Sequence, residues 1–209
     1  MKPIEHEAFV SLYQKDQSIF DKLFKDVKSV TKLTSNIKSL SKSFVSLGYK
    51  DAEKVKGDLF EIFAECFFKI LPMGSTKSGG YGIYGYKPEV SSNDNGVDGF
   101  GVGMDEKPMT IQVKFRSNPN EELLQDDLQQ FALQSIVNYG VDKDTTTNMV
   151  VFTNAKGLHW YTESKVFSGR VSALGKDDIS RLVDNNTIFW KLLIDLVLFT
   201  ITKRFENEG

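Results

Sequence analysis

The spacing of apolar side chains changes twice along the chain. Residues 1–50 repeat them at helical spacing, over 9–30 and then from about 35 to 47, and Gly48 is placed to end the second helix. Residues 51–71 are apolar on almost every side, which is typical of a buried helix. Residues 109–116 alternate between apolar and polar side chains, which predicts a strand with one buried face.

The second half of the chain predicts a parallel βαβ crossover. After the alternating strand, Asn118 and Pro119 suit the start of a helix that runs to Tyr139 and ends at Gly140. Residues 148–153 are short and apolar enough for an interior strand, so strand, helix and strand follow one another. The side chains expected to be buried in this helix are Leu124, Leu128, Phe131, Leu133 and Ile136.

The remaining segments complete an α/β fold. Residues 74–103 are rich in glycine and predict turns or a hairpin, with a short extended piece at 97–100. A further short strand is expected at 170–174, and helices at 176–183 and 186–205. We therefore expect an N-terminal helical segment over 1–50 and an α/β domain over 51–209. Cys66, Trp160 and Trp190 are expected in the core.

Charge and cysteine content limit the classes of function. The chain has 209 residues and a formal net charge of −2, so any binding to nucleic acid must be local. A single cysteine excludes an intrachain disulfide framework, and the first ten residues show no secretory signal. The longest apolar stretch, 188–201, is interrupted by Lys191 and Asp195 and is too short to span a bilayer. We expect a cytoplasmic protein without a membrane partner.

Lysines are concentrated in the first part of the chain, where they outnumber the acids. They occupy the polar faces of the predicted N-terminal helices at Lys25, Lys28, Lys32, Lys38 and Lys42. Such a face can simply be solvated, or it can contact DNA phosphates, because lysines supply the sequence-independent part of DNA affinity.

Chemistry is suggested by an acid and a Gln-x-Lys element on successive extended segments. Asp98 ends one segment, and Gln112 and Lys114 lie on the same face of the next, because residues two apart on a strand point the same way. An acid, a second oxygen ligand and an ammonium group are what metal-assisted phosphodiester hydrolysis requires.

The sequence at these positions resembles a nuclease family. The motifs are GDLFEIFAECFF with Glu61, NGVDGFG with Asp98, and IQVKFRSN with Gln112 and Lys114. They resemble the PD-(D/E)XK nuclease superfamily, in the variety found in Mrr-like restriction endonucleases, and the resemblance covers about residues 55–155. It implies a restriction-endonuclease-like mixed sheet flanked by helices, and cleavage of DNA that depends on Mg²⁺, for which Mn²⁺ can substitute.

The resemblance also implies a role for each residue. Asp98 would be the principal metal ligand, Gln112 would stand where most relatives have Asp or Glu, Lys114 would be the catalytic lysine, and Glu61 would be the acid from the preceding helix. Gln112 leaves one negative charge fewer, so Mg²⁺ should bind more weakly unless Glu61 and other oxygens complete its ligands. Val97 replaces the proline of the superfamily name, which changes little.

Each of these residues also has a simpler interpretation. Asp98 lies next to a glycine, where an aspartate is commonly part of a turn, and Gln112 and Lys114 alone fit a solvated strand face. Glu65, one helical turn after Glu61, is a rival for its role. The conjunction of all the motifs favours the nuclease interpretation.

Further residues are candidates for DNA contact. Arg116, Asn118 and Lys156 border the expected cleft, and Lys77 and Lys87 accompany tyrosines in the glycine-rich segment, which could form a DNA-contacting loop or a plain hairpin. Two other functions stay open: a non-catalytic DNA-binding module on the same fold, and a resolvase of branched DNA such as Holliday junctions. Cleavage of both strands calls for two active sites, which favours a homodimer.

Overall fold

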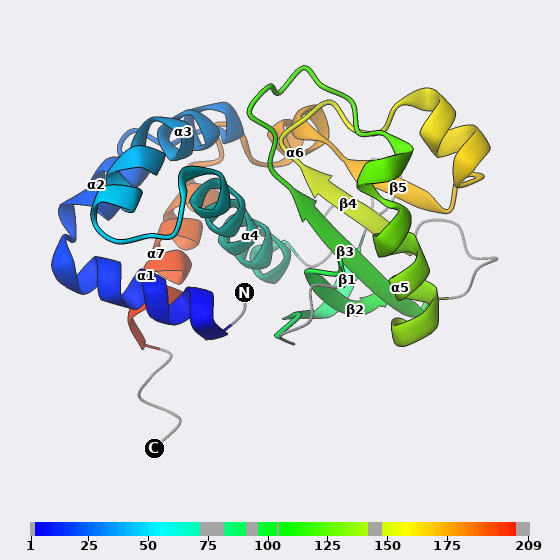
Figure 1. The fold of residues 1–209 in the computed structure, drawn as a ribbon, viewed down its shortest axis with the longest axis horizontal. Coiled ribbons are helices and arrows are strands. Elements are labelled where there is room, and N and C mark those ends of the chain that lie inside the picture. The colour runs from blue at the N-terminus through cyan, green and yellow to red at the C-terminus, as the bar shows by residue number, and fades with distance from the viewer. Residues whose placement is uncertain (1–2, 72–81, 91–95, 104, 142–147, 204–209) are drawn as a thin grey trace.

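The computed structural model describes residues 3–71, 82–90, 96–103, 105–141 and 148–203. Within these, the chain forms a five-stranded mixed sheet flanked by helices (Figure 1). The α/β class predicted from the sequence is therefore confirmed. The strands lie side by side in chain order: β1 (Ile83–Pro88), β2 (Gly99–Gly103), β3 (Pro108–Lys114), β4 (Met149–Thr153) and β5 (Val171–Leu174).

The sheet changes from antiparallel to parallel at β3. β1 pairs with β2 and β2 with β3 in antiparallel fashion, whereas β3 pairs with β4 and β4 with β5 in parallel. The register places Gln112 opposite Val151 and Lys114 opposite Thr153. Since α5 (Gln129–Tyr139) connects β3 to β4, the predicted parallel βαβ crossover is confirmed.

Helices cover both faces of the sheet. Helix α4 (Ala52–Ile70) packs on one face, and α5 covers the other (Figure 1). The helices packed beyond α4 are α1 (Pro3–Lys15), α2 (Ser18–Phe24), α3 (Val30–Ser46) and α7 (Thr187–Lys203), while α6 (Lys176–Val183) lies against α3. Among the described residues, none of these helices combines the length and apolar character needed to cross a bilayer.

Phe152 of β4 is the centre of the larger core. Its ring lies 5.1–5.6 Å from four phenylalanine rings of α4, namely Phe60, Phe63, Phe67 and Phe68. This core includes Cys66, as expected, and extends to Phe9, Phe20 and Phe44 of the N-terminal helices. Trp190 is buried as expected, but Trp160 is 65% exposed, so its assignment to the core was wrong.

Two predicted helix starts were wrong. Helix α3 begins at Val30 rather than near Ser35, because the Ser29 hydroxyl caps it by accepting a hydrogen bond from the Lys32 N–H at 3.1 Å. Residues 118–124 are not helical: the Leu123 N–H donates to the Gly157 carbonyl, and the His159 N–H donates to the Leu123 carbonyl. The backbone that would form the first turn is paired with the segment after β4.

The late start of α5 changes which of its residues are buried. A 3₁₀ turn at Gln125–Asp127 precedes the helix, and Gly140, in the left-handed region, ends it as predicted. Leu128 and Phe131 are buried, as expected, whereas Leu124 and Leu133 are exposed and Ile136 is only partly buried. Helix α6 and strand β5 match the prediction closely, and Asn186 caps α7 through a 3.0 Å bond from the Phe189 N–H.

Truncation of Phe152 should strongly destabilise the fold. Phe152→Ala removes a buried ring that contacts four others, so we expect the free energy of unfolding to fall by about 3–5 kcal/mol. Leu133→Ala, at an exposed position of α5, should change it by less than about 0.5 kcal/mol. Urea unfolding followed by circular dichroism measures both, and equal losses would contradict this description of the core.

Candidate functional site

Asp98 is fixed between the two residues of the Gln-x-Lys element. It immediately precedes β2, and its Oδ2 accepts a hydrogen bond from the backbone N–H of Val113 at 2.7 Å. Its own N–H donates to the Ile111 carbonyl at 2.9 Å. The carboxylate is therefore held at β3 beside the backbone between Gln112 and Lys114.

Glu61 lies close enough to Asp98 for their charges to interact. Burial first, and then the negative charge of Asp98, raise the pKa of Glu61 well above its ordinary value. The carboxylate of Glu61 forms no hydrogen bond or ion pair with the part of the chain that the structure describes. Glu65, its rival, is 1% exposed and pairs with Lys69 at 2.6 Å. Of the two, Glu61 is therefore the acid that interacts with Asp98.

Two further acids surround Glu61. Side-chain oxygens of Glu5 from α1 and Asp58 from α4 lie within 4.8 Å of one another and of a Glu61 oxygen, so the three could hold a metal ion. Two neighbouring side chains already bind Glu5 and Asp58. Lys54 Nζ lies 2.7 Å from Glu5 and 2.9 Å from Asp58, and the Tyr49 hydroxyl donates to Asp58 at 2.5 Å.

Burial and the paired charges shift the pKa values in this acidic cluster. Burial raises the pKa of Asp58, although the bonds from Tyr49 and Lys54 act against it. Burial tends to lower the pKa of Lys54, but the hydrogen bonds to Glu5 and Asp58 outweigh it and hold this pKa above its usual value. Burial and the charge of Asp58 raise the pKa of Tyr49. Lys54 thus serves as the internal counter-ion of Glu5 and Asp58, not of Glu61.

Gln112 carries a buried oxygen without a partner. The residue is 5% exposed, and its Oε1 makes no hydrogen bond within the described chain. Its Nε2 would lie 3.3 Å from a Cβ added at Gly96, two residues before Asp98. A buried polar oxygen normally has a partner, so a ligand with a positive charge or a proton to donate is the natural occupant. The oxygen is of the type that Mg²⁺ prefers.

Lys114 closes β3 and is only partly buried. Its backbone carbonyl accepts a hydrogen bond from the Thr153 hydroxyl at 2.8 Å, which ties β3 to β4 at their carboxyl ends. Within the described residues, its ammonium group forms no ion pair. The charge of Lys114 is therefore available to a ligand.

The four predicted site residues approach the sheet from two faces. Thr110 bonds to Ser135 of α5, so alternation places Gln112 and Lys114 on the α5 face, whereas Glu61 belongs to α4 on the other. Asp98, bonded to the β3 backbone, lies close enough to Glu61 to affect its pKa. Asp98 thus contacts the backbone of β3 and lies near Glu61, whereas Gln112 and Lys114 point to the other face.

Tyr86 is packed beside Asp98. Its ring stacks on Phe68 of α4, and a Cβ at Gly99 would lie 2.3 Å from its hydroxyl oxygen, so only glycine fits there. Burial, followed by the charges of Glu65, Asp98 and Glu61, raises the pKa of Tyr86. Tyr86 is therefore a partly buried, neutral side chain packed on α4, not an exposed ring of a DNA-contacting loop.

The residues predicted to contact DNA have different surroundings. Arg116 pairs with Asp127 and lies 3.9 Å from Glu121, so its charge is balanced within the protein. Lys87, Asn118 and Lys156 are exposed, on β1, after β3 and after β4 respectively. Lys77 lies outside the described residues.

No protein-family model, curated protein or solved structure matches the chain. The resemblance to the nuclease superfamily therefore rests on the motif residues themselves. The sequence analysis missed Glu5, Tyr49 and Lys54, which come from two segments preceding the motifs and from the first turn of α4. The sequence places Asp58 on the same polar stripe of the helix as Glu61, three residues before it, but does not predict its bonds to Tyr49 and Lys54.

The raised pKa of Glu61 should make stability depend on pH. The folded protein holds this proton to a higher pH than the unfolded chain, where the pKa is near 4.5, so the free energy of unfolding falls as pH rises between the two values. Glu61→Gln should make this fall shallower. Part of the fall should persist, because the pKa of Asp58 is also raised. Urea unfolding in EDTA from about pH 4 to 8 measures the slope. The exposed Glu122→Gln serves as control, and equal slopes in both variants and wild type would refute the assignment.

Proposed function

We propose that the protein is a Mg²⁺-dependent DNA endonuclease with a restriction-endonuclease-like fold. The observation that carries the proposal is the 2.7 Å bond from the Val113 N–H to Asp98, which brings this carboxylate to the Gln112-x-Lys114 element. The mixed sheet flanked by helices agrees with the fold that the resemblance implies. In this function the partner of the protein is DNA, and cleavage of both strands would require a second copy of the chain.

The residues fit a divalent cation in donor type. Asp98 and Glu61 would provide carboxylates, and Gln112, which points to the opposite face of the sheet from Glu61, would provide the buried oxygen that has no partner within the described residues. Mg²⁺ or Mn²⁺, when bound, would polarise a phosphoryl oxygen and lower the pKa of a bound water. The raised pKa of Glu61 means that it holds its proton longer than an exposed acid, so ionisation of Glu61 should limit activity at low pH. The ammonium of Lys114 would stabilise negative charge developing on the phosphate.

Removal of the two central charges should abolish cleavage. Asp98→Asn keeps an oxygen to accept the Val113 bond but loses the charge, and Lys114→Met keeps most of the side-chain length. We expect each to reduce nicking of supercoiled plasmid in Mg²⁺ or Mn²⁺ by at least about a hundredfold. Glu122→Gln and Lys191→Ala, both exposed, should cut at the wild-type rate.

The neutral Gln112 favours one alternative, a DNA-binding module without catalysis. Retention of DNA without cut product at any concentration of Mg²⁺ or Mn²⁺ would support it and refute the nuclease. Cutting by Asp98→Asn at the wild-type rate would also refute the assignment. A four-way junction beside the plasmid as substrate separates a resolvase from a general endonuclease.

A restored acid at position 112 should strengthen metal binding. Gln112→Glu has nearly the same shape and adds one negative charge close to Asp98, so we expect Mg²⁺ to bind about tenfold more tightly. In EDTA the same variant should melt at a lower temperature than wild type, because like charges repel. Isothermal titration with Mg²⁺ and thermal melts measure the two effects. Unchanged affinity, equal to that of the exposed control Gln129→Glu, would show that position 112 is not a ligand.

A further inference from the structure

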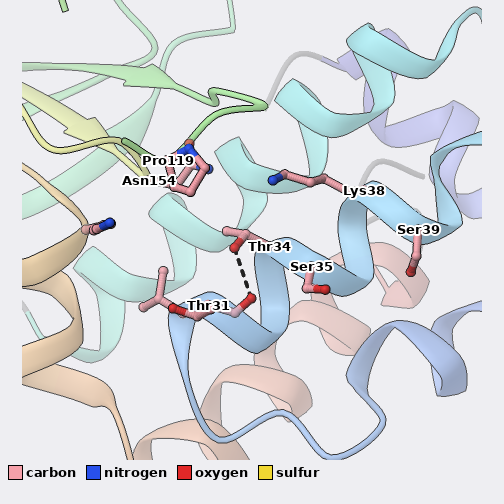
Figure 2. Close-up of a pocket in the computed structure, with 9 residues that line it drawn as sticks. Thr31, Thr34, Ser35, Lys38, Ser39, Pro119 and Asn154 are labelled. Carbon is pink, nitrogen blue, oxygen red and sulfur yellow. Dashed lines mark hydrogen bonds between the residues drawn. The ribbon is translucent and has the colours of Figure 1, made fainter. Parts of the chain in front are cut away.

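A hollow of about 570 Å³ lies between α3 and the carboxyl ends of β3 and β4 (Figure 2). One wall is a single face of α3, formed by Thr31, Thr34, Ser35, Lys38 and Ser39. The other wall consists of Pro119 after β3, Asn154 after β4 and Lys176 at the start of α6. We refer to this hollow as the α3 groove. Of its lining residues, Pro119 and Asn154 belong to the part of the chain that resembles the nucleases, and the others lie outside it.

The polar groups of the α3 groove are hydroxyls, an amide and two ammonium groups. None of the residues that line it is an acid, although acids outnumber basic residues in the chain as a whole. Such a lining repels cations and suits an anion that accepts several hydrogen bonds.

Among the described residues, neither lysine of the groove has a carboxylate partner. Lys38 forms no ion pair within the described residues, and Lys176 Nζ contacts only a neutral acceptor, Asn120 Oδ1, at 3.2 Å. By contrast, the lysines of α4 that pair with acids at 2.6–2.9 Å are Lys54, Lys56 and Lys69. The groove therefore keeps two positive charges for an external anion.

Two acids follow Lys176 but do not neutralise the groove. Asp178 is occupied by Arg181 and by the Gly175 N–H, and Asp177 is exposed and does not line the hollow. Of the five lysines on the N-terminal helices that could contact DNA, Lys38 alone lines the groove.

The donors form an elongated array. The side chains of this face that are not bonded to the helix backbone within the described residues, Thr31, Ser35 and Lys38, extend over seven residue steps, about 10 Å along the helix. Thr34 and Ser39 donate their own hydroxyl hydrogens to backbone carbonyls at 3.1 and 3.0 Å, whereas Ser35 is exposed and free to donate (Figure 2). An array of this length suits consecutive phosphates of a strand better than one small anion.

The groove is held open by the protein and connected to the candidate site. The Val30 N–H donates to Asp184 at 2.9 Å, which fixes the start of α3 to the end of α6. Asn154 accepts from the Arg116 N–H at 2.6 Å and donates to the Arg116 carbonyl at 2.8 Å. These two bonds attach Asn154, and with it the second wall of the groove, to Arg116. Arg116 lies two residues after Lys114, at the same edge of the sheet.

We propose that the α3 groove binds the phosphodiester backbone of a DNA strand that continues from the candidate site. The identity of the strand as DNA rests on the proposed function, whereas the preference for phosphate follows from the lining of the groove. Binding through phosphates carries no information on base sequence and depends strongly on salt.

The test measures DNA affinity without catalysis. Fluorescence anisotropy of a labelled duplex in EDTA, at salt from about 50 to 200 mM, compares wild type with Lys38→Ala/Lys176→Ala and with Ser35→Glu. We expect the double variant to bind at least about tenfold more weakly and its salt slope to fall by about two, one for each lost phosphate contact. Ser35→Glu adds an acid to the groove and should weaken binding similarly.

Matched controls separate the groove from general charge. Lys191→Ala removes one positive charge at an exposed position of α7, and Ser43→Glu adds the same acid at an exposed position of α3 outside the groove. Both should bind as wild type, and thermal melts check that every variant is folded. Groove variants that bind like these controls, or a wild type that binds no DNA, would overturn the proposal. The proposal would also be overturned if inorganic phosphate or a mononucleotide bound more tightly than the duplex and displaced it. That result would indicate a small phosphate ligand.

The outcomes also separate the groove from the nuclease. Asp98→Asn should bind DNA in EDTA like wild type, because it leaves the groove intact. Lysine-dependent binding without cleavage by wild type would refute the endonuclease and keep the groove. Cleavage by wild type, with groove variants that bind and cut equally well, would refute the groove and keep the endonuclease.

Discussion

The burial of helix α4 is the constraint on which the rest of the structure depends. The helix packs on the sheet through its phenylalanines and on α3 and α7 with its other sides, so few of its side chains reach water. Polar groups in such a place need partners inside the protein. Asp58 has Lys54 and Glu65 has Lys69, whereas the partly buried Glu61 has no such counter-ion among the described residues and lies near Asp98. Glu61 is therefore the carboxylate of α4 that stays available to a ligand, and Asp98 lies near it.

The change of direction within the sheet supplies the other half of the site. β3 is antiparallel to β2 and parallel to β4, so the start of β2 and the ends of β3 and β4 lie at one edge. Asp98 therefore meets β3 near its end, and Lys114, Asn154 and Lys176 follow at the same edge. Ligands commonly bind at the carboxyl ends of parallel strands in open α/β sheets. Here that edge combines negative charge near β2 with positive charge beyond β4.

Local patterns predicted the elements whose side chains face the core. They failed where contacts with distant segments decide the local structure. The strand β3, the buried helix α4 and the interior strand β4 were predicted correctly, because their apolar side chains face the core. The polar face expected for β3 is nevertheless buried, because α5 covers Thr110 and Gln112. The helix expected from Asn118 is absent, since Leu123 bonds to the backbone after β4. Leu133 is exposed, because the side of α5 that faces the sheet is formed by Phe131 and Ser135, with Ala132 and Tyr139 partly buried beside them.

The sequence by itself determined the α/β class, the crossover and the motif residues Glu61, Asp98, Gln112 and Lys114, because periodicity and spacing are local properties of the chain. Only the tertiary structure decided which charges are balanced. It brought Glu5 of the first helix to Asp58, and set Lys38 opposite Lys176 across a hollow without acids. These groups are far apart in sequence, and no local pattern specifies the distance between them. Whether a charged side chain is neutralised or free for a ligand depends on that distance.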